Sequence, residues 1–447
     1  MKRRDFVTRI MAAGGALTLG VSCGRKLNVE SDEQTTLDVS SSNFKKTITE
    51  PAREISVLAE TEVLVIGGGP AGVAAAISAS RAGAETYLVE RYNHLGGLWT
   101  GGLVLPLLST HAVDKQNRRR QVIHGIGGEM AQRFFDMGMA IHKINPVIDP
   151  EAGKYLLDEM IRESGVKMLY HSWGVNAIMD GNTIKGVFIE SKSGRLAVLA
   201  KVVIDCTGDG DVIHWSGEKS ENMPYHIGLV HRLGNVDRIN KNAPGYREMQ
   251  IGDPTPLKSV NWVNMHGKNE QNGIDMQTLS GLQLEYRKQI WDSVTEIRKT
   301  PGHEEVFLLD TASQMGVRMS RILDGEYRLT LEDSMTYKNF DDAIGISGAW
   351  TTMLYKGRKV IPAERPMWQI PYRSLLPKTV ENLIVAGRCF SFERDLVEDT
   401  RIIGTCLVTG HGAGAAAARA IKERELARNI DVKKLRKLLV EQNVWFG

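Results

Sequence analysis

Hydrophobic residues gather in short runs that end at glycine-rich loops, a pattern that predicts strands alternating with helices. Residues 62–66 form an apolar run rich in β-branched side chains, which predicts a buried strand. Residues 73–83 are mostly alanine and other small residues and end at Gly83, which predicts a helix. Residues 86–90 predict a second strand, whose last residue is the acid Glu90.

The middle of the chain has longer polar–apolar patterns. Residues 103–165 are expected to be mostly helical, with amphipathic stretches at 127–135 and 155–164. Residues 183–200 alternate between apolar and polar positions, which predicts a β-hairpin. Residues 431–442 have the spacing of an amphipathic helix, and we expect that helix to serve only in packing.

Two further apolar runs end at glycine-bearing loops. Residues 202–204 predict a strand followed by the loop 205–211, and residues 382–388 predict a strand that ends in glycine. Residues 404–414, together with the alanines that follow, predict a helix of small side chains. Such a helix can pack closely against a cofactor or a sheet.

The loop after the first strand has the spacing G-x-G-x-x-G, and it stands between a predicted strand and a predicted helix. Gly67 allows a tight turn, Gly69 lets a pyrophosphate approach the backbone, and Gly72 lets the helix pack against the sheet. The helix N-terminus offers free amides and a partial positive charge to the phosphates. Glu90, at the end of the second strand, can accept hydrogen bonds from ribose hydroxyls. The sequence therefore predicts dinucleotide binding.

The glycine loop alone does not choose between nicotinamide and flavin. The stretch 91–102 adds four glycines directly after Glu90, which suits a second close approach to a bound cofactor. Its embedded Leu95, Leu98 and Trp99 argue against a simple flexible loop. Both cofactors remain open at this point.

The N-terminal residues resemble an export signal. Lys2, Arg3, Arg4 and Arg9 precede an apolar run that is too short to span a bilayer. Arg3 and Arg4, followed by Asp5-Phe6-Val7, resemble a twin-arginine signal, with a general secretory signal or an ordinary basic N-terminus as alternatives.

Cys23 stands in a stretch that loosely resembles a lipoprotein cleavage box, although the leucine comes one place too early. A lipid anchor on Cys23 is therefore one possibility and an unmodified residue the other. Residues 23–55 are polar and low in aromatic side chains, which predicts a tether.

The formal net charge of +3 excludes one class of partner. The first 22 residues hold four basic side chains and one acidic one, so the rest of the chain is close to neutral. A neutral chain lacks the excess positive charge with which proteins bind nucleic acid. The run Arg118–Arg120 is expected to be a solvated loop.

The four cysteines, at 23, 206, 389 and 406, form no C-x-x-C pair. This spacing favours neither a zinc site nor a thiol redox centre, so a disulfide reductase is excluded and no metal is expected. His226, His231 and Arg232 are spaced so that one strand could present them, but no carboxylate or third ligand stands at a metal-binding spacing.

Several of these motifs together resemble the FAD-dependent oxidoreductases, distantly related to the flavoproteins of fumarate reductase and succinate dehydrogenase. The matching stretches follow one another in the same order as in the family, over about residues 60–425. They strongly indicate FAD and say little about the substrate. The matching stretches are VLVIGGGPAGVAAAI, LGGLWTGGL, VIDCTGDGDV, IPYRSLLP, ENLIVAGRCFS and RIIGTCLVTGHGAGAAAA.

The resemblance implies a set of cofactor-binding residues. The first loop would hold the pyrophosphate, Glu90 the adenosine ribose, and Arg388 the flavin region, while the helix beginning at Gly404 would point at the flavin ring. The residues so implied are Gly67, Gly69, Pro70, Ala71, Gly72, Glu90, Arg91, Gly96, Gly97, Gly208, Asp209, Gly387, Arg388, Gly404, Thr405 and Cys406.

The resemblance and the pattern together imply an α/β fold, a Rossmann-like FAD-binding domain with an inserted α+β substrate domain. We expect an export signal at 1–22 and a polar tether at 23–55. The FAD-binding domain would comprise 56–211 and, with the terminal helix, 376–447. Residues 212–375 would form the substrate domain.

The catalytic group is the least determined part of the sequence. Tyr372 and Arg373 stand where the chain returns from the insert, and Arg401 precedes the predicted glycine-rich helix. An arginine beside a flavin can bind a carboxylate or stabilise reduced flavin, and His411, inside that helix, can exchange protons. The plain alternatives are a buried, satisfied arginine and a histidine that caps a turn.

The expected protein is a periplasmic or lipid-tethered flavoenzyme. It would pass a hydride or an electron pair between a small organic substrate and FAD. Soluble nicotinamides are scarce outside the cytoplasm, so a quinone, a haem protein or oxygen is expected as the second partner. The alternatives are an NAD-dependent dehydrogenase and a flavin-binding protein without turnover.

Overall fold

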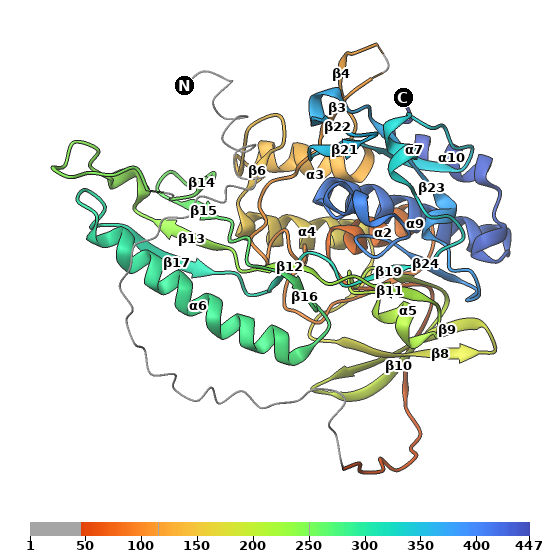
Figure 1. The fold of residues 1–447 in the computed structure, drawn as a ribbon. Helices are drawn as coiled ribbons and strands as arrows, with labels where there is room; N and C mark the ends of the chain where they lie inside the picture. The colour runs from red at the N-terminus through yellow and green to blue at the C-terminus, as the bar shows by residue number, and fades with distance from the viewer. Residues whose placement is uncertain (1–45, 115, 250) are drawn as a thin grey trace.

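The computed structural model describes residues 46–114, 116–249 and 251–447 and has a seven-stranded sheet at its centre (Figure 1). Residues 46–54 are exposed and form no helix or strand, while the export signal and Cys23 lie outside the described residues. The sheet order is β7-β2-β1-β10-β9-β8, and β24 pairs with the end of β10. The strands are β1 (Val57–Ile66), β2 (Thr86–Val89), β7 (Lys167–Leu169), β8 (Trp173–Asp180), β9 (Thr183–Ser191), β10 (Gly194–Asp205) and β24 (Leu383–Val385).

The sheet is parallel where it carries the glycine loops. β1 pairs in parallel with β2 and β10, and β10 pairs in parallel with β24. The expected hairpin at 183–200 is confirmed by β9 and β10, which run antiparallel. Because parallel strands end at one edge of a sheet, the loops after β1, β2, β10 and β24 lie at the same edge.

The predicted helices 73–83, 127–135, 155–164 and 431–442 are confirmed, each with bounds shifted by a few residues. Helices α2 and α9 cross in the middle of the molecule (Figure 1). The helices are α2 (Pro70–Arg81), α3 (Gly125–Asp136), α4 (Pro150–Ser164), α5 (Asp211–Trp215), α6 (Met276–Lys299), α7 (Leu331–Met335), α8 (Val397–Thr400), α9 (Ile403–Glu423) and α10 (Val432–Glu441).

The expectation that residues 103–165 are mostly helical is wrong for its first part. Residues 103–124 form buried irregular chain and a short hairpin, β3 (His111–Val113) with β4 (Arg119–Gln121), before α3 begins. Pro106 lacks an amide hydrogen, and Leu107 donates to the carbonyl of Pro146 rather than to a helical partner. Two short strands, β5 (Ala140–Ile141) and β6 (Val147–Ile148), also separate α3 from α4.

The insert has several small sheets, with α6 along one side (Figure 1), and much of it packs into a hydrophobic cluster that also contains Leu103, Leu105 and Val147. The sheets have the orders β14-β15-β13-β17 and β16-β12-β18, with two-stranded pairs β11-β19, β20-β23 and β21-β22. The strands are β11 (Ser220–Asn222), β12 (Tyr225–Gly228), β13 (His231–Gly234), β14 (Asp253–Pro254), β15 (Asn261–Val263), β16 (Lys268–Gln271), β17 (Phe307–Thr311), β18 (Gly316–Val317), β19 (Arg321–Leu323), β20 (Ala343–Ser347), β21 (Met353–Tyr355), β22 (Arg358–Val360) and β23 (Trp368–Pro371). The domain boundaries at 212 and 375 stay a prediction.

The expectation that one strand presents His226, His231 and Arg232 is wrong. His226 lies on β12 and His231 on β13, and the two strands belong to different sheets. The chain leaves the first sheet at Leu229 and Val230, which are buried in the core of the insert. Arg232, on β13, forms a salt bridge with Asp310, on β17, and so links two neighbouring strands of the sheet.

Candidate functional site

The loop between β1 and α2 needs glycine at two positions for packing and leaves a third position open. A Cβ on Gly67 would lie 2.5 Å from the carbonyl oxygen of Cys206, and one on Gly72 would lie 1.7 Å from that of Gly67. Gly67 also has a φ of +98°, which favours glycine. A Cβ on Gly69, the N-cap of α2, would meet no atom within 4 Å. The space beside this helix end is therefore open to a ligand.

Glu90 supports the loop from the end of β2. Its carboxylate is buried and accepts hydrogen bonds from the amides of Gly68 (2.6 Å) and Tyr92 (2.8 Å). Burial raises the pKa of Glu90, although the two amides oppose this shift. A Cβ on Gly97 would lie 3.0 Å from the Cα of Gly69, so the second glycine stretch lies against the first.

The loop after β10 meets the end of β24 through an ion pair. Asp209 lies 2.6 Å from the guanidinium of Arg388 and accepts a hydrogen bond from the Ser320 hydroxyl at 2.8 Å. Burial acts to raise the pKa of Asp209, but Arg388 and Arg91 outweigh it and hold the pKa below its ordinary value. Burial and the neighbouring Asp209 raise the pKa of Asp211 to about 6.

An aromatic stack that the sequence did not reveal lies at the end of β2. The guanidinium carbon of Arg91 lies 4.9 Å from the ring centre of Tyr92 and 5.4 Å from that of Trp173. Trp173 is the first residue of β8, and it is 54% exposed. Only the pairing of distant segments brings Trp173 beside the residues that follow Glu90.

The start of α9 carries the predicted residues Gly404, Thr405 and Cys406. Its N-cap residue forms no side-chain cap, so amides of the first turn are free to face an anion. Thr405 donates its hydroxyl proton to the carbonyl of Asp399 (2.7 Å), which fixes the helix to α8. Burial raises the pKa of the Cys406 thiol to about 12, despite Arg388 and Arg401, so this thiol is not a nucleophile at neutral pH.

The N-termini of α2 and α9 point the same way. A Cβ on Gly410 would lie 2.0 Å from the carbonyl oxygen of Ala71, and one on Gly414 would lie 2.1 Å from that of Ala75. The helices therefore cross with parallel directions. At a rise of 1.5 Å per residue, α9 begins about 9 Å beyond the start of α2.

The residues of this edge fit an FAD. The open space at Gly69 lies at a helix N-terminus, which suits the pyrophosphate. The second helix N-terminus, about 9 Å farther on, suits the negative charge that reduced flavin carries. The loops after β1, β2, β10 and β24 carry the predicted cofactor residues between Gly67 and Arg388. The structure brings these four loops together at this edge.

Among the candidate catalytic residues, three have structural contacts away from this edge. His411 donates through Nε2 to Gln442 (2.6 Å) and accepts at Nδ1 from the amide of Ile126 (3.5 Å). Burial lowers its pKa to about 4. The Tyr372 hydroxyl donates to the carbonyl of Ala427 at 2.7 Å.

The side chain of Arg373 is 46% exposed, and its guanidinium carbon lies 4.9 Å from the ring centre of Tyr327. Roles for Tyr372, Arg373 and His411 in the reaction stay predictions.

Arg401 lies two residues before α9 and forms an ion pair with Glu398. The insert adds Tyr225, whose hydroxyl donates to Glu398 at 3.0 Å. Arg318 and Arg401 influence each other electrostatically. The sequence predicted Arg401 but not Tyr225 or Arg318, because these two residues are distant from Arg401 along the chain.

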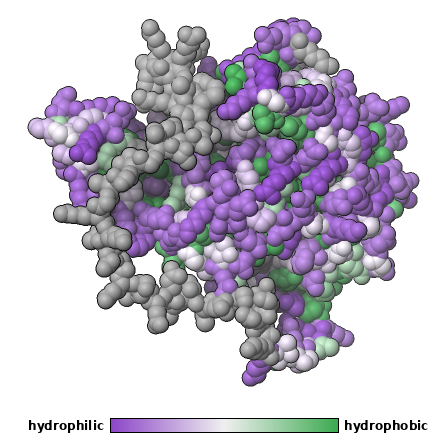
Figure 2. Space-filling model, viewed as in Figure 1, coloured by the Kyte–Doolittle hydropathy of each residue, from purple (hydrophilic) through white to green (hydrophobic). Residues whose placement is uncertain are grey.

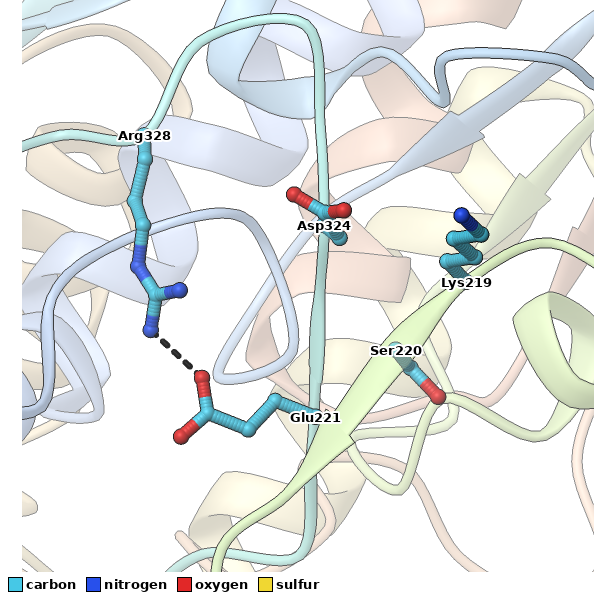
Figure 3. A pocket seen from close by; sticks show the side chains of 5 residues that line it. All are labelled: Lys219, Ser220, Glu221, Asp324 and Arg328. Carbon is cyan, nitrogen blue, oxygen red and sulfur yellow. Dashed lines mark hydrogen bonds and ion pairs between the residues drawn. The ribbon is translucent and has the colours of Figure 1, made fainter.

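A second, surface pocket lies on the β11-β19 ribbon (Figure 3). Its lining includes Arg328 and Glu221, which pair at 2.6 Å, and Asp324, which pairs with Lys378. None of the predicted cofactor-binding residues lines this pocket.

Within the described part of the chain, three cysteines are free and buried. The same part holds no cluster of histidine, cysteine and acidic residues able to bind a metal ion. None of its helices combines the length and the apolar composition that crossing a membrane requires. The face seen in Figure 2 is mostly hydrophilic, with apolar residues in scattered patches.

The parallel sheet, the glycine loop and the two helix ends define an α/β protein that binds a dinucleotide. The chain belongs to the FAD dependent oxidoreductase family, whose model matches residues 62–228 and 230–439. The family and the Rossmann-like core are those that the sequence predicted.

Curated relatives match part of the chain. A digeranylgeranylglycerophospholipid reductase from Picrophilus torridus is 26% identical over 222 residues, which are 47% of this chain and 55% of the relative. A thiamine thiazole synthase from Methanococcus vannielii is 28% identical over 182 residues, which are 38% of this chain and 65% of the relative. The chain thus spans about half the length of the reductase.

Among solved structures, a geranylgeranyl bacteriochlorophyll reductase-like protein from Thermoplasma acidophilum matches with a TM-score of 0.45 and 15% identity. That match covers 86% of this chain and 84% of the other.

Proposed function

We propose that this oxidoreductase is an exported enzyme that transfers a hydride or an electron pair between a small organic substrate and FAD. A quinone or a haem protein, rather than a nicotinamide, is the second partner. The observation that carries the proposal is the pair of helix N-termini, one beside the open space at Gly69 and one about 9 Å farther along.

The two helix ends have different tasks. FAD, when bound, supplies the capacity to take up and return a pair of electrons. The amides of α2 would bind its pyrophosphate. The free amides at the start of α9 would stabilise negative charge on the ring, which raises the reduction potential.

The buried thiols near these helix ends are unreactive. Cys206, Cys389 and Cys406 are buried, and burial raises the pKa of each thiol. They therefore remain protonated and do not compete as nucleophiles. Asp209 and Arg388 neutralise each other beside the loop.

The proposed acceptor is tested on purified protein. The flavin is first bleached anaerobically with a panel of sugars, hydroxy acids and steroids. The reduced protein is then mixed with a water-soluble quinone or with NAD⁺, and its absorbance is followed. We expect rapid return of the oxidised spectrum with the quinone. Faster return with NAD⁺ would contradict the proposed acceptor.

Export rests on the sequence of the first 22 residues. A pathway that carries folded proteins suits an enzyme that must receive its cofactor before it leaves the cytoplasm. The Arg3→Lys, Arg4→Lys double variant should accumulate inside the cell with FAD bound. If it is exported as well as the parent protein, the twin-arginine assignment is wrong.

A further inference from the structure

A cluster of charged side chains lies beside the first turn of α9, where the insert meets the FAD-binding part. Arg401 and Glu398 come from the segment before α9, and the insert contributes Arg318, His226 and His266. The Tyr225 hydroxyl donates to Glu398, as described above. The cluster is thus built from both parts of the molecule.

Arg318 is a guanidinium without an acidic partner. Its Nη2 donates to Nδ1 of His266 at 3.1 Å, and within the described residues it forms no ion pair at 4.0 Å or less. Burial lowers the pKa of Arg318 to about 10, and the nearby Arg401 adds to this effect, but the group stays protonated at neutral pH. A partly buried cation of this kind is stabilised by an anion.

The cluster has one positive charge in excess. Two guanidiniums, those of Arg318 and Arg401, face the carboxylate of Glu398, whereas Glu270, which also acts on His226, is paired with Arg394. Burial and the positive charge of Arg318 lower the pKa of both His226 and His266, so the two rings are neutral at pH 7. Burial, with help from Glu398, raises the pKa of Tyr225 to about 12, which keeps the phenol neutral as well.

The two histidines add hydrogen-bonding groups to the cluster. His266 accepts from Arg318 at Nδ1, which places the ring proton on Nε2. Nδ1 of His226 is buried and has no hydrogen-bond partner among the described residues. The charge and these groups together describe a polar ligand site rather than a packed core.

The cluster lies close to the proposed place of the flavin ring. The Cys406 thiol, in the first turn of α9, donates to the carbonyl of Arg401 at 3.6 Å, and the positive charges of Arg388 and Arg401 both act on this thiol. Arg318 is followed two residues later by Ser320, which donates to Asp209 of the flavin loop. A ligand between Arg318 and Arg401 would therefore touch both the insert and the start of α9.

We propose that Arg318, together with Arg401, binds the carboxylate of a monoanionic organic substrate. This inference rests on the proposed function and names the substrate class for the same site. The planar fork of arginine matches a carboxylate in geometry. A monoanion balances the single excess charge, whereas a phosphate dianion would leave the site negative.

The test uses the full chain with FAD bound and in the oxidised state. Propionate, the isosteric but neutral propionamide, and inorganic phosphate are titrated at constant ionic strength, and the absorbance spectrum of the flavin is followed. We expect a saturable shift with propionate and none with propionamide. The Arg318→Gln variant should weaken propionate binding by about tenfold or more while keeping its FAD.

A matched control is Arg394→Gln. The Arg394 side chain is exposed and pairs with Glu270 at 3.4 Å. Because exposed ion pairs contribute little, we expect Arg394→Gln to change propionate binding by less than about twofold. The Arg318→Lys variant keeps the charge and loses the fork, and it should bind propionate with intermediate affinity. This variant keeps the test decisive if Arg318→Gln loses its flavin.

Three results would overturn the proposal: equal binding of propionate and propionamide, unchanged propionate binding in both Arg318 variants, or tighter binding of phosphate that depends on Arg318. None of these requires turnover. Failure of the proposed function is seen separately, as a protein whose flavin no substrate reduces.

Discussion

At the scale of single residues, the glycines of the first loop fall into two groups. Two are required by the packing of the loop itself, and one faces the space predicted for the ligand. Gly67 and Gly72 are enclosed by backbone, so any side chain there disturbs the loop itself. Gly69 faces open space and has an ordinary φ of −68°. A side chain at Gly69 would therefore leave the loop intact and occupy the place of the pyrophosphate.

We expect Gly69→Ala to lower FAD affinity by about tenfold or more, because the added methyl displaces the pyrophosphate from the helix N-terminus. The thermal midpoint of the FAD-free protein should stay within a few degrees of the parent, since the methyl meets no protein atom. Flavin fluorescence titration and thermal unfolding of the FAD-free protein measure the two quantities. Unchanged FAD affinity would mean that the phosphates bind elsewhere.

At the scale of secondary-structure elements, the crossing of α2 and α9 sets the geometry of the site. The helices approach so closely that backbone meets backbone at Gly410 and Gly414. This contact fixes how far the start of α9 extends beyond the start of α2. The distance between the two proposed cofactor contacts thus depends on small residues in the middle of both helices.

We expect Gly410→Ala to destabilise the protein by about 1–3 kcal/mol, because the new Cβ would lie 2.0 Å from the carbonyl oxygen of Ala71 and the helices must move apart. Gly281→Ala, in α6, is the matched control. A Cβ there meets no atom within 4 Å, so alanine should stabilise by about 0.5–1 kcal/mol. Urea unfolding gives both values. Equal effects of the two changes would show that the helices do not touch.

At the scale of the whole molecule, the insert is fastened to the flavin-binding part at the cofactor loops. Gln314 donates its side-chain amide to Nε2 of His94 at 3.0 Å, and its backbone amide donates to the carbonyl of Gly101. Ser320 adds its bond to Asp209. The insert thus contacts the loops that are predicted to hold the cofactor, and we expect cofactor binding to influence the position of the insert.

Buried histidines make the stability of the whole fold depend on pH. Burial lowers the pKa of both His231 and His411 to about 4, whereas an unfolded histidine titrates near pH 6.5. Between these values the unfolded chain binds protons that the folded chain does not. Stability is therefore unaffected above about pH 6.5 and falls as the pH is lowered towards 4.

The His411→Gln variant isolates the contribution of one histidine, since glutamine can still donate to Gln442. We expect the free energy of unfolding of the parent to fall by up to about 1.4 kcal/mol more per pH unit than that of the variant, between pH 6 and 4.5. Urea unfolding at several pH values measures this difference. Parallel curves would mean that the pKa of His411 is the same in the folded and the unfolded protein.

The sequence by itself determined the features that depend on consecutive residues. The strands beside the glycine loops, the hairpin at 183–200, the helices α2, α3, α4, α9 and α10 and the FAD-binding family were predictable, because backbone conformation at glycine and the periodicity of apolar residues are local properties. The helix α6 and the strands of the insert were not predicted. The irregular chain at 103–124 was missed, because the bond from Leu107 to Pro146 is not local.

Only the tertiary structure decided which side chains meet. The sequence predicted Arg401 but not Arg318, since the packing of the insert against the start of α9 brings these distant residues together. It also could not show that His411 turns towards Gln442 and Ile126. Contacts of this kind depend on how whole elements pack, and no pattern within one segment records that packing.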